Sequence, residues 1–209
     1  MPGPPPTALQ PRKTPRQSRS RVTVEAIFEA TIQVLLRGGM NELTTTRVAE
    51  RAGVSVGTMY QYFPNKQALV YALNARYLDA LAARIEATCR EHAGAPLGQM
   101  VEALINTYWT AKTERADVTR ALYRSVAELN NDVLIHAFAE RVDRATTEML
   151  ASACDAVFPD VPRANLALVT VIYGTVRNAF ERGVSDQEAA ALRQDLTTMC
   201  RAYLANFRA

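Results

Sequence analysis

The chain is most constrained by one stretch near its N-terminus, which begins at Thr44 and reads TTTRVAERAGVSVGTMYQYFPNK. The spacing predicts two short helices joined by a tight turn. Thr44 or Thr45 can cap the first helix, because a threonine oxygen accepts an unpaired N–H of the first turn. Gly53 fits the left-handed conformation that ends many helices, Ser55 is suited to cap the second helix, and Pro64 ends it. The pattern is typical of a helix-turn-helix with its second helix in the recognition position.

Residues in and around this stretch agree in type and spacing with a known family. They are Leu43–Thr45, Val48-Ala49, Ala52-Gly53-Val54-Ser55, Gly57-Thr58, Tyr60, Tyr62-Phe63, Asn65-Lys66 and Ala68-Leu69. On these residues the segment Val24–Leu73 resembles the tetracycline-repressor (TetR) family of bacterial one-component transcription regulators. The resemblance implies an all-α fold, with an N-terminal three-helix DNA-binding domain and a larger C-terminal helical domain for ligand binding and dimerisation. The expected division is a basic, disordered tail over 1–21, the DNA-binding domain over 22–66 and the helical domain over 67–209.

The recognition helix, from about Val56 to Tyr62, starts with short residues that let its backbone approach base edges in the major groove. Together with the resemblance, this predicts ten residues that face double-stranded DNA. They are Thr45, Thr46, Arg47, Val56, Gly57, Thr58, Tyr60, Gln61, Tyr62 and Lys66. Most of these side chains suit phosphate contacts, which set position and carry no sequence information. Tyr60 and Tyr62 lie two residues apart and point in different directions, so packing against the next helix is an alternative for one of them.

The charge distribution favours the same partner. Residues 1–76 hold ten Lys or Arg against four Glu, whereas the remaining residues carry a net charge of −3. A basic end on a mildly acidic body is typical of a protein that meets a polyanion through that end. For the tail over 1–21, rich in proline and then in basic residues, two readings stay open: an inert extension, or an arm that contacts DNA.

Helical periodicity continues through the rest of the chain. A first helix over Val24–Arg37, ended by Gly38-Gly39, is expected to cover the motif, and a long helix over Asn65–Glu91 carries an apolar seam. The expected core of the first domain is Phe28, Val34, Leu43, Val48, Ala52, Val54, Met59 and Phe63. In the larger domain, candidate residues for an apolar ligand pocket are Met100, Tyr108, Trp109, Tyr123 and Phe138. An ordinary helical core is the alternative reading of these five residues.

Two helices are expected at the C-terminal end. The run LVTVIYGTV, within Leu166–Phe180, is rich in β-branched residues but keeps helical spacing, and Ser185–Glu188 is a capping box that starts the last helix. Their apolar faces are expected to form half of a four-helix dimer bundle, as in the resembling family. Candidate interface residues are Val169, Tyr173, Val176, Phe180, Leu192, Leu196, Met199 and Tyr203. Closure of the subunit's own core is the alternative.

The sequence shows none of the motifs that would indicate an enzyme or a membrane protein. It holds no GxSxG, Walker loop, HExxH or GxGxxG motif, and no apolar run of about 18 residues. We therefore expect no enzyme, catalytic residue, cofactor, metal or membrane partner, and a cytoplasmic protein. The expected function is a homodimeric regulator, a repressor that binds a palindromic operator and is released by a small, largely apolar effector. The alternative is a helical architectural DNA-binding or protein-interaction module without a ligand.

Overall fold

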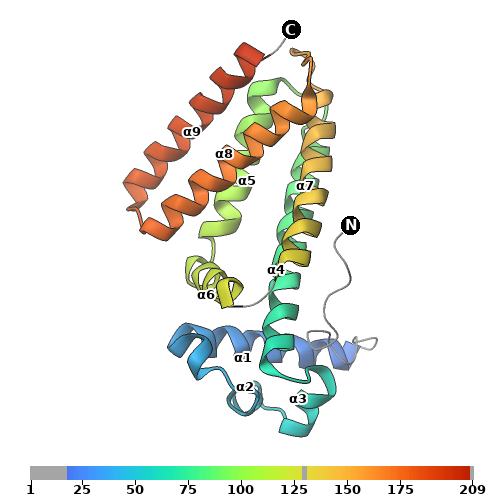
Figure 1. The fold of residues 1–209 in the computed structure, drawn as a ribbon, viewed down its shortest axis with the longest axis vertical. Coiled ribbons are helices and arrows are strands. Elements are labelled where there is room, and N and C mark those ends of the chain that lie inside the picture. Colours follow the sequence, from blue (N-terminus) through green and yellow to red (C-terminus); the bar gives the residue numbers. More distant parts are fainter. Residues whose placement is uncertain (1–17, 129–130, 208–209) are drawn as a thin grey trace. The chain divides into compact units, whose positions relative to one another are not determined.

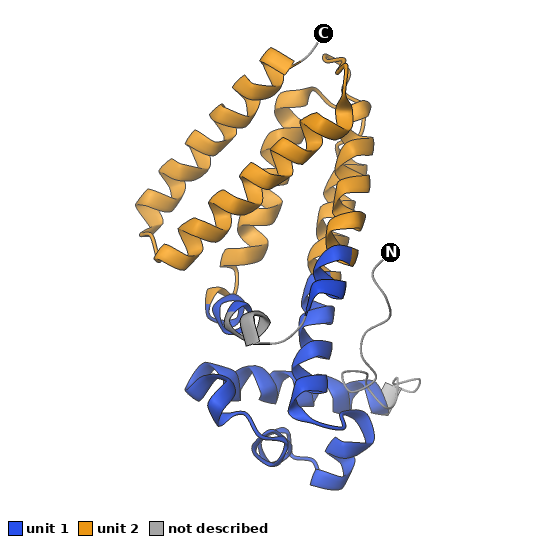
Figure 2. Cartoon of the chain, in the orientation of Figure 1, with its two compact units in different colours: residues 1–78, 117–136 blue, residues 79–116, 137–209 orange. Residues whose placement is uncertain are grey.

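The structure, a computed structural model, describes residues 18–128 and 131–207, and within them it is all-α without a strand, as the sequence predicts. The helices are α1 (Ser18–Glu42), α2 (Thr45–Ala52), α3 (Val56–Tyr62), α4 (Lys66–Glu91), α5 (Leu97–Thr113), α6 (Ala116–Glu128), α7 (Asp132–Ala151), α8 (Val161–Arg182) and α9 (Asp186–Phe207) (Figure 1). The described chain forms two compact units (Figure 2). Unit 1 comprises the chain up to Leu78 together with Asp117–His136, and unit 2 comprises Asp79–Ala116 and the chain from Ala137 onward. The expected division at residues 66 and 67 stays a prediction.

Unit 1 has a core of its own, built where α1, α2 and α3 pack together with the first half of α4 and with α6. Six of the eight expected core residues are buried, and Ala52 and Val54 are partly buried against the same cluster. The helix starts at Thr44, Ser55 and Asn65 each have a side-chain capping bond. The Asn65 side chain, for example, accepts a hydrogen bond from the Ala68 backbone N–H at 2.7 Å, at the start of α4.

α1 differs from its prediction at both ends. It begins at Ser18, so Ser18–Arg21 form its first turn, although the sequence placed them in the disordered tail. The rest of that tail lies outside the described residues. At the other end the helical backbone is interrupted at Gly39, where φ is 64° and ψ is −160°. The glycine pair was expected to end the helix, and a residue without a Cβ adopts this positive φ at little cost.

Unit 2 contains the second half of α4 together with α5, most of α7, α8 and α9. Its core takes one face from each helix, including Ile85, Met100, Met149, Ile172 and Leu196, all at most 2% exposed. The β-branched run that could pass for a strand lies in α8, so its helical prediction is confirmed. The capping box at the start of α9 is formed, because the Ser185 N–H donates to the Glu188 carboxylate at 2.8 Å and the Glu188 N–H donates to Ser185 Oγ at 3.3 Å.

Candidate DNA-binding site

The first helix of the motif, α2, is fixed at both ends by local bonds. Thr44 is its N-cap, and its hydroxyl oxygen accepts the backbone N–H of Arg47 at 3.2 Å. Gly53 ends the helix in the left-handed conformation, with φ 67° and ψ 31°. Val48 and Ala49 are fully buried between these ends, so they anchor α2 to the core of unit 1. The turn into α3 is therefore set by residues whose roles the sequence predicts.

The second helix, α3, divides into a buried and an exposed face. Ser55 caps it by accepting the Thr58 N–H at 2.9 Å, and Met59 is fully buried beneath it. Four predicted DNA-contact residues lie on the other side and are exposed: Val56, Gly57, Tyr60 and Gln61. Because their positions follow the pattern i, i+1, i+4 and i+5, they form one continuous stripe along the helix. A recognition helix presents an exposed stripe of this kind to a major groove, so the DNA contacts expected of these four residues stay a prediction.

Gly57 lies in the middle of this stripe, and nothing in the described protein requires a glycine there. A methyl group built on its Cα would meet only Ser55 Oγ, at 3.7 Å, which is an ordinary van der Waals contact. The backbone of α3 is helical at this position, so a positive φ is not the reason either. The absence of a side chain leaves the peptide backbone of α3 open to an approaching surface.

Thr45 and Tyr60, both predicted to contact DNA, are joined directly across the motif. The hydroxyl oxygens of these two residues lie 3.2 Å apart, at hydrogen-bonding distance. Thr45 is at the start of α2 and Tyr60 is in the last turn of α3, so the bond places one hydroxyl pair between the two helices. A tyrosine hydroxyl that is held this way keeps a donor or acceptor for an outside group such as a phosphate oxygen.

Other predicted contact residues are engaged within the protein. The guanidinium of Arg47 forms an ion pair with the carboxylate of Glu42 and donates to the Glu42 carbonyl oxygen at 3.1 Å. Thr58 Oγ1 lies 2.8 Å from Ser55 Oγ, within the helix cap. The Lys66 ammonium donates to the carbonyl oxygen of Met40 at 3.2 Å. An ammonium group has three donors, so this bond leaves Lys66 able to bind a phosphate as well. Thr46, by contrast, is exposed.

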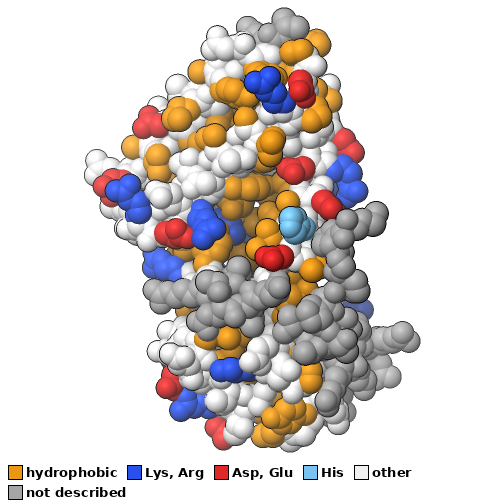
Figure 3. Space-filling model, in the orientation of Figure 1, with side chains coloured by type: hydrophobic (Ala, Val, Ile, Leu, Met, Phe, Trp, Pro, Cys, Tyr) orange, Lys and Arg blue, Asp and Glu red, His pale blue; other side chains and the backbone are white. Residues whose placement is uncertain are grey.

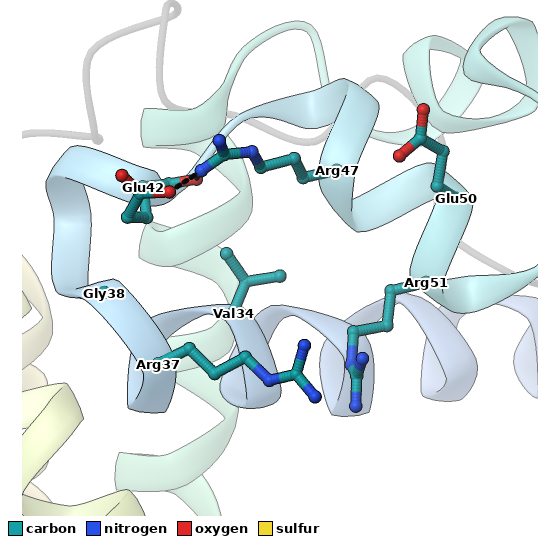
Figure 4. A pocket seen from close by; sticks show the side chains of 7 residues that line it. All are labelled: Val34, Arg37, Gly38, Glu42, Arg47, Glu50 and Arg51. Carbon is teal, nitrogen blue, oxygen red and sulfur yellow. Dashed lines mark hydrogen bonds and ion pairs between the residues drawn. The ribbon is translucent and has the colours of Figure 1, made fainter.

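Arg47 also lines an open cleft of about 550 Å³ between α1 and α2 (Figure 4). Val34 lies at its floor, and the side chains of Arg37 and Arg51 converge at one side of it. The Arg51 Nε donates to the side-chain oxygen of Gln33 on α1, and Glu42 holds Arg47 at the opposite side. The cleft therefore brings three arginines to the edge of the helix-turn-helix, of which the sequence singled out one.

Tyr62 does not share the exposed stripe of α3. Its side chain is 7% exposed and belongs to the core of unit 1, with its ring centroid 6.4 Å from that of Phe63. Tyr60, in contrast, is 42% exposed. The packing alternative that the sequence left open for one of the two tyrosines therefore applies to Tyr62, and the expected DNA contact by this residue has no support from its position.

The candidate ligand residues are divided between the two units. Tyr123 lies on α6 in unit 1, whereas Met100, Tyr108, Trp109 and Phe138 lie in unit 2. The first three of these four are buried in the core of unit 2, and Phe138 packs against it. The Tyr108 ring lies 4.3 Å from the ring of Tyr173, centroid to centroid, and the Phe138 ring lies 6.2 Å from Tyr173. Unit 2 thus holds an aromatic cluster, and a pocket built from all five residues stays a prediction.

The candidate interface residues are also divided. Val176 and Leu196 belong to the core of unit 2, whereas Val169 and Phe180, at 6% and 8% exposure, are buried without being members of that core cluster. Tyr173 packs on Tyr108, and Leu192 packs partly against the same core. Only Met199 and Tyr203, at 62% and 38% exposure, project from the subunit. Four of the eight expected interface residues, Tyr173, Val176, Leu192 and Leu196, therefore belong to or pack on the subunit's own core, and the dimer interface stays a prediction.

Sequence reasoning missed Lys112, which is 3% exposed in unit 2. It lies four residues after Tyr108 on α5, and its Nζ is 5.3 Å from the centroid of the Tyr108 ring. The burial of this lysine could have been predicted from helical spacing. Residue 112 falls on the buried face of α5, which is defined by Leu97, Met100, Leu104 and Tyr108. Within residues 18–128 and 131–207, no group of three or more His, Cys, Asp or Glu side chains is placed to hold a metal ion.

No helix within residues 18–128 and 131–207 has the length and hydropathy needed to cross a membrane.

Comparison with known proteins matches both parts of the chain to one family. Residues 27–73 match the model of bacterial regulatory proteins of the tetR family, and residues 96–204 match the model of the tetracyclin repressor-like C-terminal domain. Among curated relatives, the class C tetracycline repressor protein of Escherichia coli is 28% identical over 187 residues, which cover 83% of this chain and 72% of that protein.

Solved structures agree in fold. A TetR-family transcriptional regulator from Streptomyces coelicolor superposes with a TM-score of 0.64 at 24% identity, over 90% of this chain and 98% of that one. A TetR family transcription regulator from Marinobacter aquaeolei VT8 gives a TM-score of 0.63 at 15% identity, over 86% and 96% of the two chains. The two family models, the relative and the shared fold all point the same way. This chain belongs to the TetR family of bacterial transcription regulators.

Proposed function

We propose that this protein is a transcriptional repressor that binds a palindromic operator as a homodimer and is released by a small, largely apolar effector. The observation that carries the DNA-binding part is the exposed stripe of α3 with an unobstructed glycine at its centre. Repression is the activity named for the relative from Escherichia coli. Family membership supports a cytoplasmic, non-enzymatic role.

In this proposal α3 enters the major groove. Val56 packs on a thymine methyl, Gly57 brings the backbone close to the base edges, and Gln61 reaches a base or phosphate. The joined hydroxyls of Thr45 and Tyr60 bind a phosphate, and so do Thr46 and Lys66 at the two ends of the motif. Arg47 and Thr58 would exchange their internal partners, Glu42 and Ser55, for the DNA backbone.

We propose that the dimer forms through the outer faces of α8 and α9, whose apolar residues the subunit leaves exposed. Leu166 and Met199 are each 62% exposed, Val171 is 40% and Tyr203 is 38% exposed. Gly174 follows Val171 by three residues on α8, and a Cβ built on it has nothing within 4 Å, so the subunit itself does not require a glycine there. A glycine on an exposed helix face permits the close approach of a second helix. These residues replace the buried part of the expected interface set.

The experiment that tests the proposal is fluorescence anisotropy with DNA from upstream of the protein's own gene, with unrelated DNA of equal length as control, at two salt concentrations. Tight binding to one segment with two protomers per site supports the operator-binding dimer. Equal, strongly salt-dependent binding to both DNAs would indicate an architectural DNA-binding protein instead.

Gly57→Ala sharpens this test, because the added methyl group fits the free protein. The variant is expected to keep or raise its stability, since alanine favours helix over glycine by up to about 1 kcal/mol. Its operator affinity is expected to fall by about tenfold, the cost of forcing a methyl group into a close backbone approach. Gly98→Ala on α5 is the matched control, since it makes the same change outside unit 1, where the added Cβ meets only the flexible side chain of Arg201, at 3.3 Å. Unchanged operator affinity for Gly57→Ala would contradict the proposal that α3 approaches the bases of the major groove at this residue.

A further inference from the structure

The cleft between α1 and α2 gathers more positive than negative charge. Its lining includes three arginines and two acidic residues, which are Arg37, Arg47, Arg51, Glu42 and Glu50. All five belong to unit 1, at the edge of the helix-turn-helix (Figure 4). Figure 3 shows both basic and acidic side chains over the part of unit 1 where α1 and α2 lie, so the surrounding surface is mixed in charge. The arrangement inside the cleft therefore decides what it can bind.

Gln33 on α1 fixes the position of Arg51 relative to Arg37. The Arg51 Nε donates a hydrogen bond to the side-chain oxygen of Gln33, so the guanidinium of this α2 residue lies against the surface of α1. Gln33 and Arg37 are four residues apart on α1, and side chains at this spacing are neighbours on one face of a helix. Arg51 is thereby held one helical turn from Arg37, and Figure 4 shows both guanidinium groups on the same side of the cleft.

In the described part of the chain, neither of these two arginines has an acidic partner. Arg37 forms no hydrogen bond or ion pair with a described residue, and Arg51 has only the neutral amide on α1. Glu42 is already paired with Arg47. Figure 4 shows the carboxylate of Glu50 pointing away from the two guanidinium groups. Two like charges are thus held near each other without a counter-charge, and an anion bound between them would be attracted by both.

The donors on this side of the cleft suit a phosphate group. A guanidinium presents a rigid fork of N–H donors that matches two phosphate oxygens, and it is always charged. Arg37 and Arg51 are both exposed, so an anion can reach them without a change of fold. The buried Val34 at the floor of the cleft offers no competing acceptor. The open volume of about 550 Å³ leaves room for a phosphate that is part of a larger molecule.

The cleft continues the surface that is proposed to meet the DNA backbone. Arg47 and Arg51 are four residues apart on α2, so they share one face of this helix. Thr46, next to Arg47 in the first turn of α2, is also a proposed phosphate contact. A DNA backbone that passes the start of α2 therefore comes close to the mouth of the cleft.

We propose that Arg37 and Arg51 form a phosphate-binding site in this cleft, one helical turn beyond the phosphate contact proposed for Arg47. The position favours a phosphate of the DNA backbone. A free phosphate ion or ester offers the same chemistry, and the experiment separates the two sources. With DNA as its source, this inference rests on the proposed function, because it extends the DNA-contacting surface from the helix-turn-helix to α1.

The test compares loss of charge with retention of charge at the same two positions. Arg37→Gln combined with Arg51→Gln removes both charges, whereas Arg37→Lys combined with Arg51→Lys keeps both charges and removes only the forks. Both side chains are exposed, so each double variant is expected to fold, which circular dichroism checks. Arg90→Gln combined with Arg144→Gln is the matched control, because it removes two charges from exposed positions in unit 2.

Binding of the full-length proteins to DNA is measured by fluorescence anisotropy over a range of salt concentrations, with the segment from upstream of the gene and with an unrelated duplex. The Gln double variant is expected to bind about tenfold more weakly and to lose about one unit of salt slope for each bound protomer, since one phosphate contact is removed. The Lys double variant is expected to keep the slope, because the release of counterions depends on charge. The unit 2 control is expected to match wild type.

Inorganic phosphate provides the second arm, in isothermal titration calorimetry at constant ionic strength in chloride. A lowered salt slope without saturable binding of inorganic phosphate would support the site and assign it to the DNA backbone. Saturable binding that the Gln double variant loses, with an unchanged slope, would support the site and assign it to free phosphate. Both effects together would support a site for which DNA and free phosphate compete.

Three outcomes would overturn the phosphate site. They are the absence of both effects, an equal loss of slope in the unit 2 control, and an equal loss of slope in the Lys double variant. Failure of the proposed function gives a different result. If wild type binds both duplexes equally, operator recognition fails, whereas the difference in slope between wild type and the Gln double variant still decides the site. If operator binding is specific and the Gln double variant behaves as wild type in both arms, the repressor proposal stands and the phosphate site is wrong.

Discussion

Replacing the buried lysine should stabilise the protein at neutral pH and do so less at high pH. The pKa of Lys112 falls from 10.5 to about 8 on folding. At about 1.4 kcal/mol for each tenfold change in a proton equilibrium, the buried charge costs the folded state about 3 kcal/mol. Lys112→Met removes this cost of about 3 kcal/mol but also loses the cation–π contact with Tyr108, which reduces the stabilisation by about 1 kcal/mol. Lys112→Met is therefore expected to be more stable than wild type by about 2 kcal/mol at pH 7.

The sign of the pH effect follows from the lowered pKa. Below about pH 8 Lys112 is charged in both the folded and the unfolded chain, so the whole penalty is present. Between pH 8 and 10.5 the folded protein has lost this proton while the unfolded chain still binds it, so wild type gains stability relative to the variant. By pH 10 wild type is expected to have gained about 2.5 kcal/mol relative to Lys112→Met, so the advantage of about 2 kcal/mol that the variant has at pH 7 is gone.

Urea unfolding followed by far-ultraviolet circular dichroism measures this difference, with both proteins at the same concentration at pH 7 and pH 10. Other groups that titrate in this range, such as Cys89, are common to both proteins and cancel in the comparison. Lys66→Met, at a partly buried position in unit 1, is the control for the removal of a lysine as such. The difference in free energy of unfolding between wild type and Lys112→Met could instead be the same at both pH values. This result would refute the argument that the difference comes from the buried charge and would attribute it to side-chain shape.

Three further predictions concern DNA and the dimer. Tyr60→Phe should weaken binding to all DNA in anisotropy, because it removes the hydroxyl bonded to Thr45, with thermal stability within about 0.5 kcal/mol of wild type; retained affinity would exclude a phosphate contact. Lys66→Ala should lower the salt slope by about one unit, and an unchanged slope would leave Lys66 only its bond to Met40. Met199→Arg should convert dimer to monomer in light scattering, and a persisting dimer would place the interface elsewhere.

The helix-turn-helix was predictable because each of its signals is local. Thr44, Gly53, Ser55 and Asn65 act on backbone groups within a few residues, so their bonds form wherever the helices are placed. The exposed face of α3 follows from the same register. Tyr62 was harder to assign, because a tyrosine one residue before the buried Phe63 can face either way, and only the packing of α1 and α4 decides it.

Periodicity predicted the helices of unit 2 but not the partner of each face. α8 has an inner apolar stripe with Val169 and Val176 and an outer one with Leu166 and Val171. A sequence shows both stripes alike, so the buried one was taken for the interface. Tyr173 was likewise assigned to the dimer, although it packs on Tyr108 within the subunit. These choices depend on contacts between residues far apart in the chain, which helical spacing does not encode.

The scarcity of lysine has a practical consequence for following this protein in solution. Lys66 lies beside the helix-turn-helix and Lys112 beside the aromatic cluster, so each unit contributes one lysine to the described residues. Reductive methylation with ¹³C-formaldehyde would give each of them its own dimethylamine signal in an NMR spectrum. One signal would report on operator DNA and the other on the surroundings of the aromatic cluster in unit 2, within a single sample. The same spectrum would show whether occupancy at one unit is felt at the other.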